Sequence, residues 1–210
     1  MELFFRYIRE NWMDLLVFTG QHIFMVLIGL LLALAVGIPL GVLASRNRRT
    51  GQVILTLANI IQVFPSLALL VLLMVAFGLG TTTVVIGLFL YSLLPIIRNT
   101  YVGLTQVDKS IMEAGKGVGM SPLQVMLSVQ VPLALPFILT GIRIAAVIAI
   151  GVATIAPLVG GDGLGREIYS GINMSNSARL YAGAIPAALL ALVADLLLEK
   201  VQQSARLSRR

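Results

Sequence analysis

Five long apolar runs dominate the pattern of hydrophobic and polar positions along the chain. They cover residues 21–44, 53–77, 82–97, 133–159 and 181–198. A helix of roughly 17 to 25 apolar residues crosses the hydrocarbon core of a bilayer. The runs are too long and too uniformly apolar for the alternating strands of a membrane barrel. The pattern therefore predicts an all-α polytopic membrane protein with about five transmembrane helices, of which the third is the shortest.

Basic residues gather in alternate segments between these runs. The segments after the first, third and fifth runs hold ten of them: Arg46, Arg48, Arg49, Arg98, Lys109, Lys116, Lys200, Arg206, Arg209 and Arg210. The remaining segments hold four, which are Arg6, Arg9, Arg166 and Arg179. Lys and Arg are enriched on the cytoplasmic side of membrane proteins. We therefore expect the N-terminus outside and the C-terminus in the cytoplasm, which agrees with an odd number of spans.

This orientation divides the chain into three parts. They are an N-terminal extracytoplasmic segment (1–19), a membrane domain (20–199) in contact with lipids, and a basic cytoplasmic tail (200–210). Near the start of the chain, no small-residue cleavage site follows a short apolar core, so we expect no removable signal peptide.

The composition agrees with a bilayer environment and narrows the chemistry. Hydrophobic residues make up 58% of the chain and charged residues only 11%. The net charge of +6 is explained by the cytoplasmic flanks of the spans, and no stretch mixes basic with aromatic residues as a nucleic-acid platform does, so we expect no nucleic-acid partner. The absence of cysteine excludes a disulfide or thiolate chemistry.

Catalytic and metal-binding motifs are missing from the sequence. There is one histidine, His22, and no H-E-x-x-H, so we expect no metal site and no cofactor. Gly115-Lys116 is followed by Gly117, and no glycine precedes Gly115 at the spacing of a P-loop. The sequence thus predicts no catalytic residue and no ATP hydrolysis by a P-loop on this chain.

A few polar residues lie inside the second run. Asn59, Gln62 and Ser66 recur at three- or four-residue spacing, which places them on one helical face beside Pro65. Polar side chains within a membrane mark pathways, but they also form hydrogen bonds between helices. The pattern leaves both interpretations open.

Two other features of the runs concern packing. Small residues recur every four positions in the first and fifth runs: Ala33, Gly37 and Gly41, and Gly183, Ala187 and Ala191. They favour close helix approach, either within the subunit or in a dimer. In the fourth and fifth runs, Arg143 either snorkels to the cytoplasmic surface or stays inside, and Asp195 is expected to pair with a basic residue.

The segment from Arg98 to Val131 is the only long one predicted on the cytoplasmic side. Asp108, Ser110 or Ser121 can cap short helices, and Ser121 followed by Pro122 is a typical helix start. The glycines Gly115, Gly117 and Gly119 favour a sharp turn. We expect a short helix, a glycine-rich bend and a second short helix lying flat under the membrane, which either docks into a partner or rests at the headgroups.

The same segment resembles the EAA motif of ABC-importer permeases. That motif reads Glu-Ala-Ala, three residues, Gly, nine residues, Ile-x-Leu-Pro, and here it corresponds to Glu113, Ala114, Gly115, Gly119, Val129, Val131 and Pro132. The chain departs from it at Gly115, Val129 and Val131. The resemblance implies a coupling helix that docks into a separate ATPase. It assigns anchoring to Glu113 and the bend to Gly119, with apolar contacts from residues 120–126, including Met120 and Pro122.

The wider sequence is similar to the glycine betaine, carnitine and choline branch of these permeases. The phrases that carry the similarity are QVFPSL (62–67), PIIRNTY (95–101), EAGKGVGM (113–120), GGDGLG (160–165) and YSGI (169–172). The GG-x-GLG phrase also occurs in permeases for methionine and other solutes. The similarity covers about residues 20–200, which implies an ABC transmembrane type-1 permease domain at 20–199 in a bacterial inner membrane.

This resemblance implies an osmoprotectant importer that works by alternating access. The implied partners are a cytoplasmic ABC ATPase dimer, a second permease copy or paralogue, and an extracytoplasmic solute-binding protein. Candidates for the translocation path are the polar residues Asn59, Gln62 and Ser66 of the second run. Phe64 and Tyr91 join them because aromatic faces bind quaternary ammonium groups. Two alternatives remain: a permease for methionine or another small amine or amino acid, and a secondary transporter or channel built by oligomerisation.

Overall fold

The computed structural model describes residues 2–207, and these residues are almost entirely helical. The helices are α1 (Glu2–Arg46), α2 (Arg48–Val63), α3 (Ser66–Phe77), α4 (Thr81–Thr105), α5 (Lys109–Gly117), α6 (Pro122–Val125), α7 (Val131–Ala153), α8 (Gly165–Asn173) and α9 (Ser177–Leu207). A π turn (Met126–Gln130) joins α6 to α7, and a 3₁₀ turn (Ala156–Val159) follows α7. Four helices of the described chain are long and apolar enough to cross a membrane, and the bent pair α2–α3 gives a fifth when it is counted as one span. The predicted all-α fold with about five spans is confirmed.

The first and last helices extend beyond the predicted spans. Helix α1 begins at Glu2 and continues past residue 19 to Arg46, with one kink at Asn11, where φ is −120° and ψ is 17°. The predicted boundary at residue 19 therefore falls inside a helix, and the side of the membrane on which 1–19 lies stays a prediction. Helix α9 continues to Leu207. Of the predicted basic tail, residues 208–210, including Arg209 and Arg210, lie outside the described residues.

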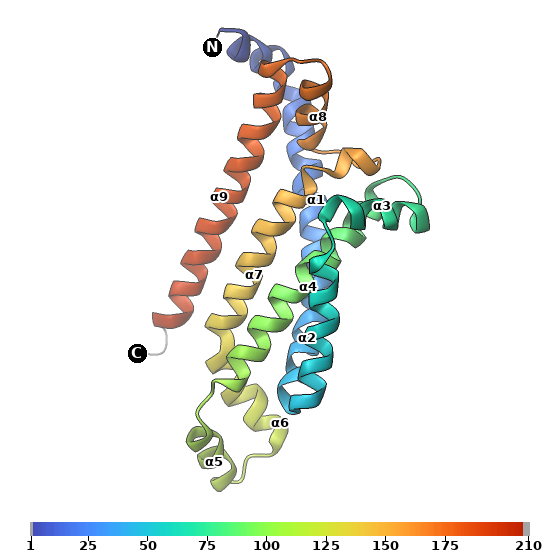
Figure 1. Ribbon diagram of the computed structural model, residues 1–210. Coiled ribbons are helices and arrows are strands. Elements are labelled where there is room, and N and C mark those ends of the chain that lie inside the picture. Colours follow the sequence, from blue (N-terminus) through green and yellow to red (C-terminus); the bar gives the residue numbers. More distant parts are fainter. Residues whose placement is uncertain (1, 208–210) are drawn as a thin grey trace.

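The second predicted span is not one continuous helix. Helix α2 ends at Val63, α3 begins at Ser66, and the two are bent by 96°. Proline disfavours the helical conformation of the residue before it, and Phe64 is accordingly extended, with ψ at 134°. The Tyr91 hydroxyl donates a hydrogen bond to the carbonyl of Phe64. The predicted span at 53–77 therefore consists of two helices separated by a full break, after which α3 projects away from the long helices (Figure 1).

Helix α4 lies at the centre of the bundle, where it packs against α1, α2, α3 and α7 (Figure 1). The small residues of α1 allow this contact: a Cβ on Gly37 would lie 2.9 Å from Ile96 Cγ2, and one on Gly41 would lie 2.5 Å from Thr100 Cβ. In α9, a Cβ on Gly183 would lie 2.7 Å from a carbonyl oxygen just before α8. The small faces therefore serve packing within the subunit, the first of the two interpretations.

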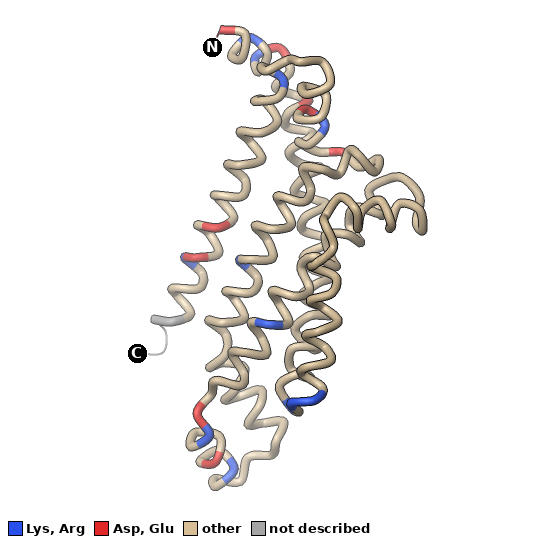
Figure 2. The backbone as a smooth tube through the Cα atoms, in the orientation of Figure 1, with Lys and Arg blue, Asp and Glu red and all other residues tan. Residues whose placement is uncertain are grey.

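Helices α7 and α9 are joined by an ion pair inside the bundle. Arg143 Nη2 donates to Asp195 Oδ2 at 2.7 Å and to Glu199 Oε2 at 3.1 Å, and Arg143 Nε also donates to Asp195. In Figure 2 these charges lie between clusters of charged residues at the two ends of the bundle. The expectation that Asp195 pairs with a basic residue is confirmed. Because two carboxylates neutralise Arg143, the side chain does not have to reach the surface.

Candidate functional site

A helical hairpin stands at one end of the bundle, opposite the end that carries the N-terminus (Figure 1). It consists of α5, the turn at 118–121 and α6, and we call it the coupling hairpin (109–125). Helix α5 packs mainly against α6 and the π turn, which follow it directly in the chain. The hairpin thus depends on local contacts for its shape.

Side-chain caps fix where both helices of the coupling hairpin begin. Asp108 Oδ1 accepts a hydrogen bond from the Ser110 amide at 2.9 Å, and this bond lowers the pKa of the Asp108 carboxyl. Ser121 Oγ accepts from the Gln124 amide, while Gln124 Oε1 accepts from the Ser121 amide at 2.8 Å. This reciprocal pair is a capping box with Pro122 in the first turn. The predicted caps Asp108 and Ser121 are confirmed, and Ser110 serves only as a donor.

Gly119 makes the bend between the two helices. Its φ is +86°, a left-handed conformation that side chains disfavour. The Gly119 amide donates to the Lys116 carbonyl at 2.9 Å, and the Met120 amide donates to the Gly115 carbonyl at 3.1 Å. These two bonds form a Schellman motif, which satisfies the last carbonyls of α5. Gly115 and Gly117 remain helical, so only one of the three predicted turn glycines is needed for the bend.

The second helix of the hairpin is not separate from the membrane span. Residues from Pro122 to Ala153 form one helix of 32 residues, which corrects the expectation of a short helix lying flat under the membrane. In a regular α-helix the ring of Pro132 would clash with the carbonyl of Ser128. The π turn at Met126–Gln130 lies at this point and widens the helix there, so the helix continues across the proline.

The two faces of the coupling hairpin differ in character. On the inner face, Gly115 is buried, and a Cβ placed on it would lie 3.4 Å from Met120 Sδ and from Val125 Cγ2. Glu113 and Ala114 are exposed on the outside, and within residues 2–207 no basic side chain forms an ion pair with Glu113. Four large apolar side chains are also exposed on the hairpin and the π turn: Ile111, Val118, Leu123 and Leu127. Pro122 and Pro132 are exposed as well.

The predicted path residues surround the break between α2 and α3. Asn59 is exposed on α2, whereas Ser66 begins α3, so the bend separates two residues that were expected on one helical face. Gln62 Nε2 donates to the Tyr91 carbonyl at 3.4 Å. Tyr91 is buried and its hydroxyl is engaged by the Phe64 carbonyl, while the Phe64 ring is 42% exposed. Of the two aromatic candidates, Phe64 alone presents an open face.

Sequence reasoning missed a polar groove between α2 and α4. The groove has a volume of about 460 Å³, and its polar lining residues are Gln52, Thr56, Asn59 and Arg98. The three α2 residues follow one another at four- and three-residue spacing, which places them on one face of the helix. The spacing of these three residues could have indicated a polar helix face from the sequence alone. Arg98, in contrast, was expected only to border the third span on its cytoplasmic side.

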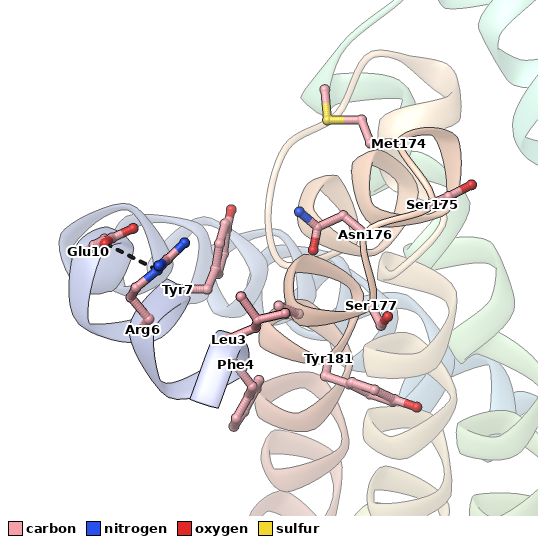
Figure 3. Close-up of a pocket in the computed structure, with 11 residues that line it drawn as sticks. Leu3, Phe4, Arg6, Tyr7, Glu10, Met174, Ser175, Asn176, Ser177 and Tyr181 are labelled. Atoms are coloured by element: carbon pink, nitrogen blue, oxygen red, sulfur yellow. Dashed lines mark ion pairs between the residues drawn. The ribbon is translucent and has the colours of Figure 1, made fainter. Parts of the chain in front are cut away.

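A cluster of hydrogen-bonded side chains that the sequence did not indicate joins three helices at the opposite end of the bundle. The carboxylate of Glu167, which is only 3% exposed, accepts two hydrogen bonds of 3.0 Å from Arg179 and one of 2.5 Å from the Tyr7 hydroxyl. We call these three residues the Glu167 network. They join α1, α8 and α9, beside a pocket of about 590 Å³ that the first turns of α1 and the α8–α9 turn enclose (Figure 3). Arg6 and Glu10 form an exposed ion pair of 3.7 Å in that pocket.

The glycine-rich segment 160–165 before α8 forms a bend. Gly160 and Gly163 have φ values of +79° and +100°. Within residues 2–207, no group of three or more His, Asp or Glu side chains is placed to hold a metal ion.

Known proteins with similar sequences are bacterial permeases. The carnitine transport permease protein OpuCD of Listeria monocytogenes is 49% identical over 88% of this chain and 83% of its own length. The choline transport system permease protein OpuBD of Bacillus subtilis is 43% identical over 97% of this chain and 91% of its own length.

The fold also matches a solved structure. A crystal form of the MetNI methionine ABC transporter superposes with a TM-score of 0.84, covering 93% of this chain and 98% of the matched one, at 21% identity. The family model for binding-protein-dependent transport system inner membrane components matches residues 37–207. The chain therefore belongs to this family of multi-pass inner-membrane permease subunits.

Proposed function

We propose that this chain is the permease subunit of an ATP-driven importer for a glycine betaine-, carnitine- or choline-like osmoprotectant. The observation that carries the proposal is the coupling hairpin, which presents Glu113 and a set of apolar side chains outside the bundle. Such a surface is suited to insertion into a groove of a cytoplasmic protein. The names of the relatives support the class of solute.

The complete transporter in this proposal has several chains. A cytoplasmic ABC ATPase dimer grips the coupling hairpin and hydrolyses ATP, so the permease itself is not catalytic. A second copy of the permease or a paralogue completes the path, because five spans rarely enclose one alone. An extracytoplasmic solute-binding protein delivers the solute on the side of the N-terminus.

The continuous helix from Pro122 to Ala153 provides the mechanical link in this mechanism. When the ATPase subunits close, they move the coupling hairpin, and α6 transmits that movement to α7 without an intervening flexible joint. Helix α7 packs against α4 and α9, so the movement reaches the centre of the bundle. The spans then alternate between inward-facing and outward-facing arrangements.

The break between α2 and α3 is the proposed place of solute passage. Non-helical backbone inside a membrane is tolerated where it is buried in protein or lines a water-filled cavity. Asn59, Gln62 and Ser66 offer hydrogen bonds near the break, and the exposed ring of Phe64 offers a face for a quaternary ammonium group. Tyr91 shapes the path by holding the carbonyl of Phe64.

The ATP-driven mechanism is tested by measuring solute uptake by the transporter reconstituted with its ATPase and binding protein. We expect uptake that requires ATP and persists with an ionophore, and we expect Glu113→Lys to abolish it. Lys200→Glu, a charge reversal at an exposed position of α9, should leave uptake within twofold of wild type. Uptake that collapses with the ionophore, ignores ATP and survives Glu113→Lys would identify a secondary transporter or channel instead.

Competition by unlabelled solutes tests the cargo. Glycine betaine, carnitine or choline should compete with the labelled solute, whereas methionine should not. If only methionine competes, the chain is still the permease of an ATP-driven importer, but its solute is an amino acid and not an osmoprotectant.

A further inference from the structure

The polar groove between α2 and α4 is lined by two helices that belong to candidate membrane spans. Helix α2 begins at Arg48, and Asn59 lies eleven residues further along it, which corresponds to roughly 16 Å of helix. Arg98 lies within α4, seven residues before its end. The groove therefore begins about one turn into α2 and extends over about two helical turns.

A polar face at this depth needs a polar neighbour. Gln52, Thr56 and Asn59 are all exposed on the same side of α2. Lipid chains offer no hydrogen bonds, and polar groups in membrane helices accordingly face water, protein or a solute. The other residues of the groove, Leu55 and Leu94, are apolar, so the polar groups converge on a limited space.

Arg98 gives this groove an uncompensated positive charge. It is exposed, and within residues 2–207 no carboxylate forms an ion pair with it. Arg143, by contrast, which lies in the predicted fourth span, is bound by both Asp195 and Glu199. The amide and hydroxyl groups around Arg98 are neutral, so the guanidinium is free to pair with an anionic group that enters the groove.

We propose that Arg98, with Gln52, Thr56 and Asn59, binds the carboxylate of a zwitterionic solute as it passes toward the cytoplasm. Guanidinium groups bind carboxylates through two parallel hydrogen bonds. Glycine betaine and carnitine carry a carboxylate besides their quaternary ammonium group, whereas choline carries only the cation. The groove thus selects zwitterions over cations. This inference rests on the proposed function and specifies its solute.

The experiment compares uptake of carnitine and choline by the reconstituted complex. Arg98→Gln should lower the initial rate of carnitine uptake about tenfold, the effect expected of one charge-assisted hydrogen bond, and should leave choline uptake unchanged or raised. Arg98→Lys, which keeps the charge, should retain at least a third of carnitine uptake. Arg48→Gln removes a neighbouring exposed charge outside the groove and should leave the ratio of the two rates unchanged.

Several results would overturn the inference. Equal losses for both solutes in an assembled complex would mean that Arg98 pairs with the second permease copy or has a structural role. An unchanged ratio, or equal losses in Arg98→Gln and Arg98→Lys, would likewise exclude a carboxylate site. If Arg98→Gln does not assemble, Gln52→Leu provides the comparison, with an expected threefold fall in the carnitine-to-choline ratio. A wild-type complex that moves neither solute would refute the proposed function itself.

Discussion

The two ends of the bundle are built in contrasting ways. At the N-terminal end, the buried Glu167 network joins helices that are up to 160 residues apart in the chain. At the other end, the coupling hairpin is shaped by caps and turns between residues that are close in sequence. Long-range contacts make the first end part of the cooperative fold. Local contacts let the second end be displaced by a partner without unfolding the bundle.

Among variants that test this contrast between the two ends, we expect the largest loss of stability from a change in the Glu167 network. Glu167→Ala leaves the Arg179 guanidinium without its partner at a largely buried position, which should lower the free energy of unfolding by about 3 kcal/mol. Thermal unfolding in detergent measures this change. Arg166→Ala, which removes an exposed ion pair with Asp162 and a cation–π contact with the Phe18 ring, should cost at most about 1 kcal/mol. Equal effects of the two changes would show that the network does not stabilise the fold.

At the bend of the coupling hairpin we expect a smaller effect, which lowers transport but not the stability of the bundle. Gly119→Ala forces a side chain into a left-handed conformation, which costs about 1 to 2 kcal/mol. ATP-driven uptake should fall about tenfold while the unfolding temperature of the bundle stays the same. Gly117→Ala is the matched control, because Gly117 is helical and a Cβ there meets no atom within 4 Å. A lowered unfolding temperature in Gly119→Ala would contradict the independence of the two ends.

The smallest effect is expected from the capping box. Ser121→Ala removes the side-chain acceptor for the Gln124 amide and should destabilise the start of α6 by about 1 kcal/mol. Amide hydrogen exchange in residues 109–130 should then accelerate about fivefold, with no change around Glu167. Ser128→Ala, at an exposed position of the same helix, should leave exchange unaltered. Faster exchange at both ends of the bundle would mean that they are coupled.

The features that sequence predicted best are local ones. Ser121 followed by Pro122, and Asp108 before a polar stretch, indicated helix starts because each cap acts on an amide two or three residues away. The five apolar runs indicated spans because hydrophobic length alone decides whether a helix can cross a bilayer. The sequence limited the position of the bend to Gly115, Gly117 or Gly119, but it did not indicate that Gly119 is the one with left-handed backbone.

The features that sequence did not predict depend on contacts between distant segments. The run at 53–77 is apolar enough on average to read as one span despite its few polar residues, so hydropathy shows no break. The 96° bend involves both Pro65 and the distant Tyr91 hydroxyl. Asp195 was expected to pair with some basic residue, but the choice of Arg143 follows only from the packing of α7 on α9. The distribution of basic residues along the sequence places Arg98 beside a span, but it cannot show that Arg98 faces α2 across a groove.

The π turn between α6 and α7 sets the rotational phase of the coupling hairpin. A π turn holds one residue more than the α-helical turn it replaces, and each residue of an α-helix advances the backbone by about 100°. If the same residues of Met126–Gln130 wound into regular α-helix instead, the hairpin would rotate by about 100° around the axis of α7. A partner fixed beneath the membrane would then face the wrong side of the hairpin, so the angular position of Glu113 depends on this turn remaining π-helical.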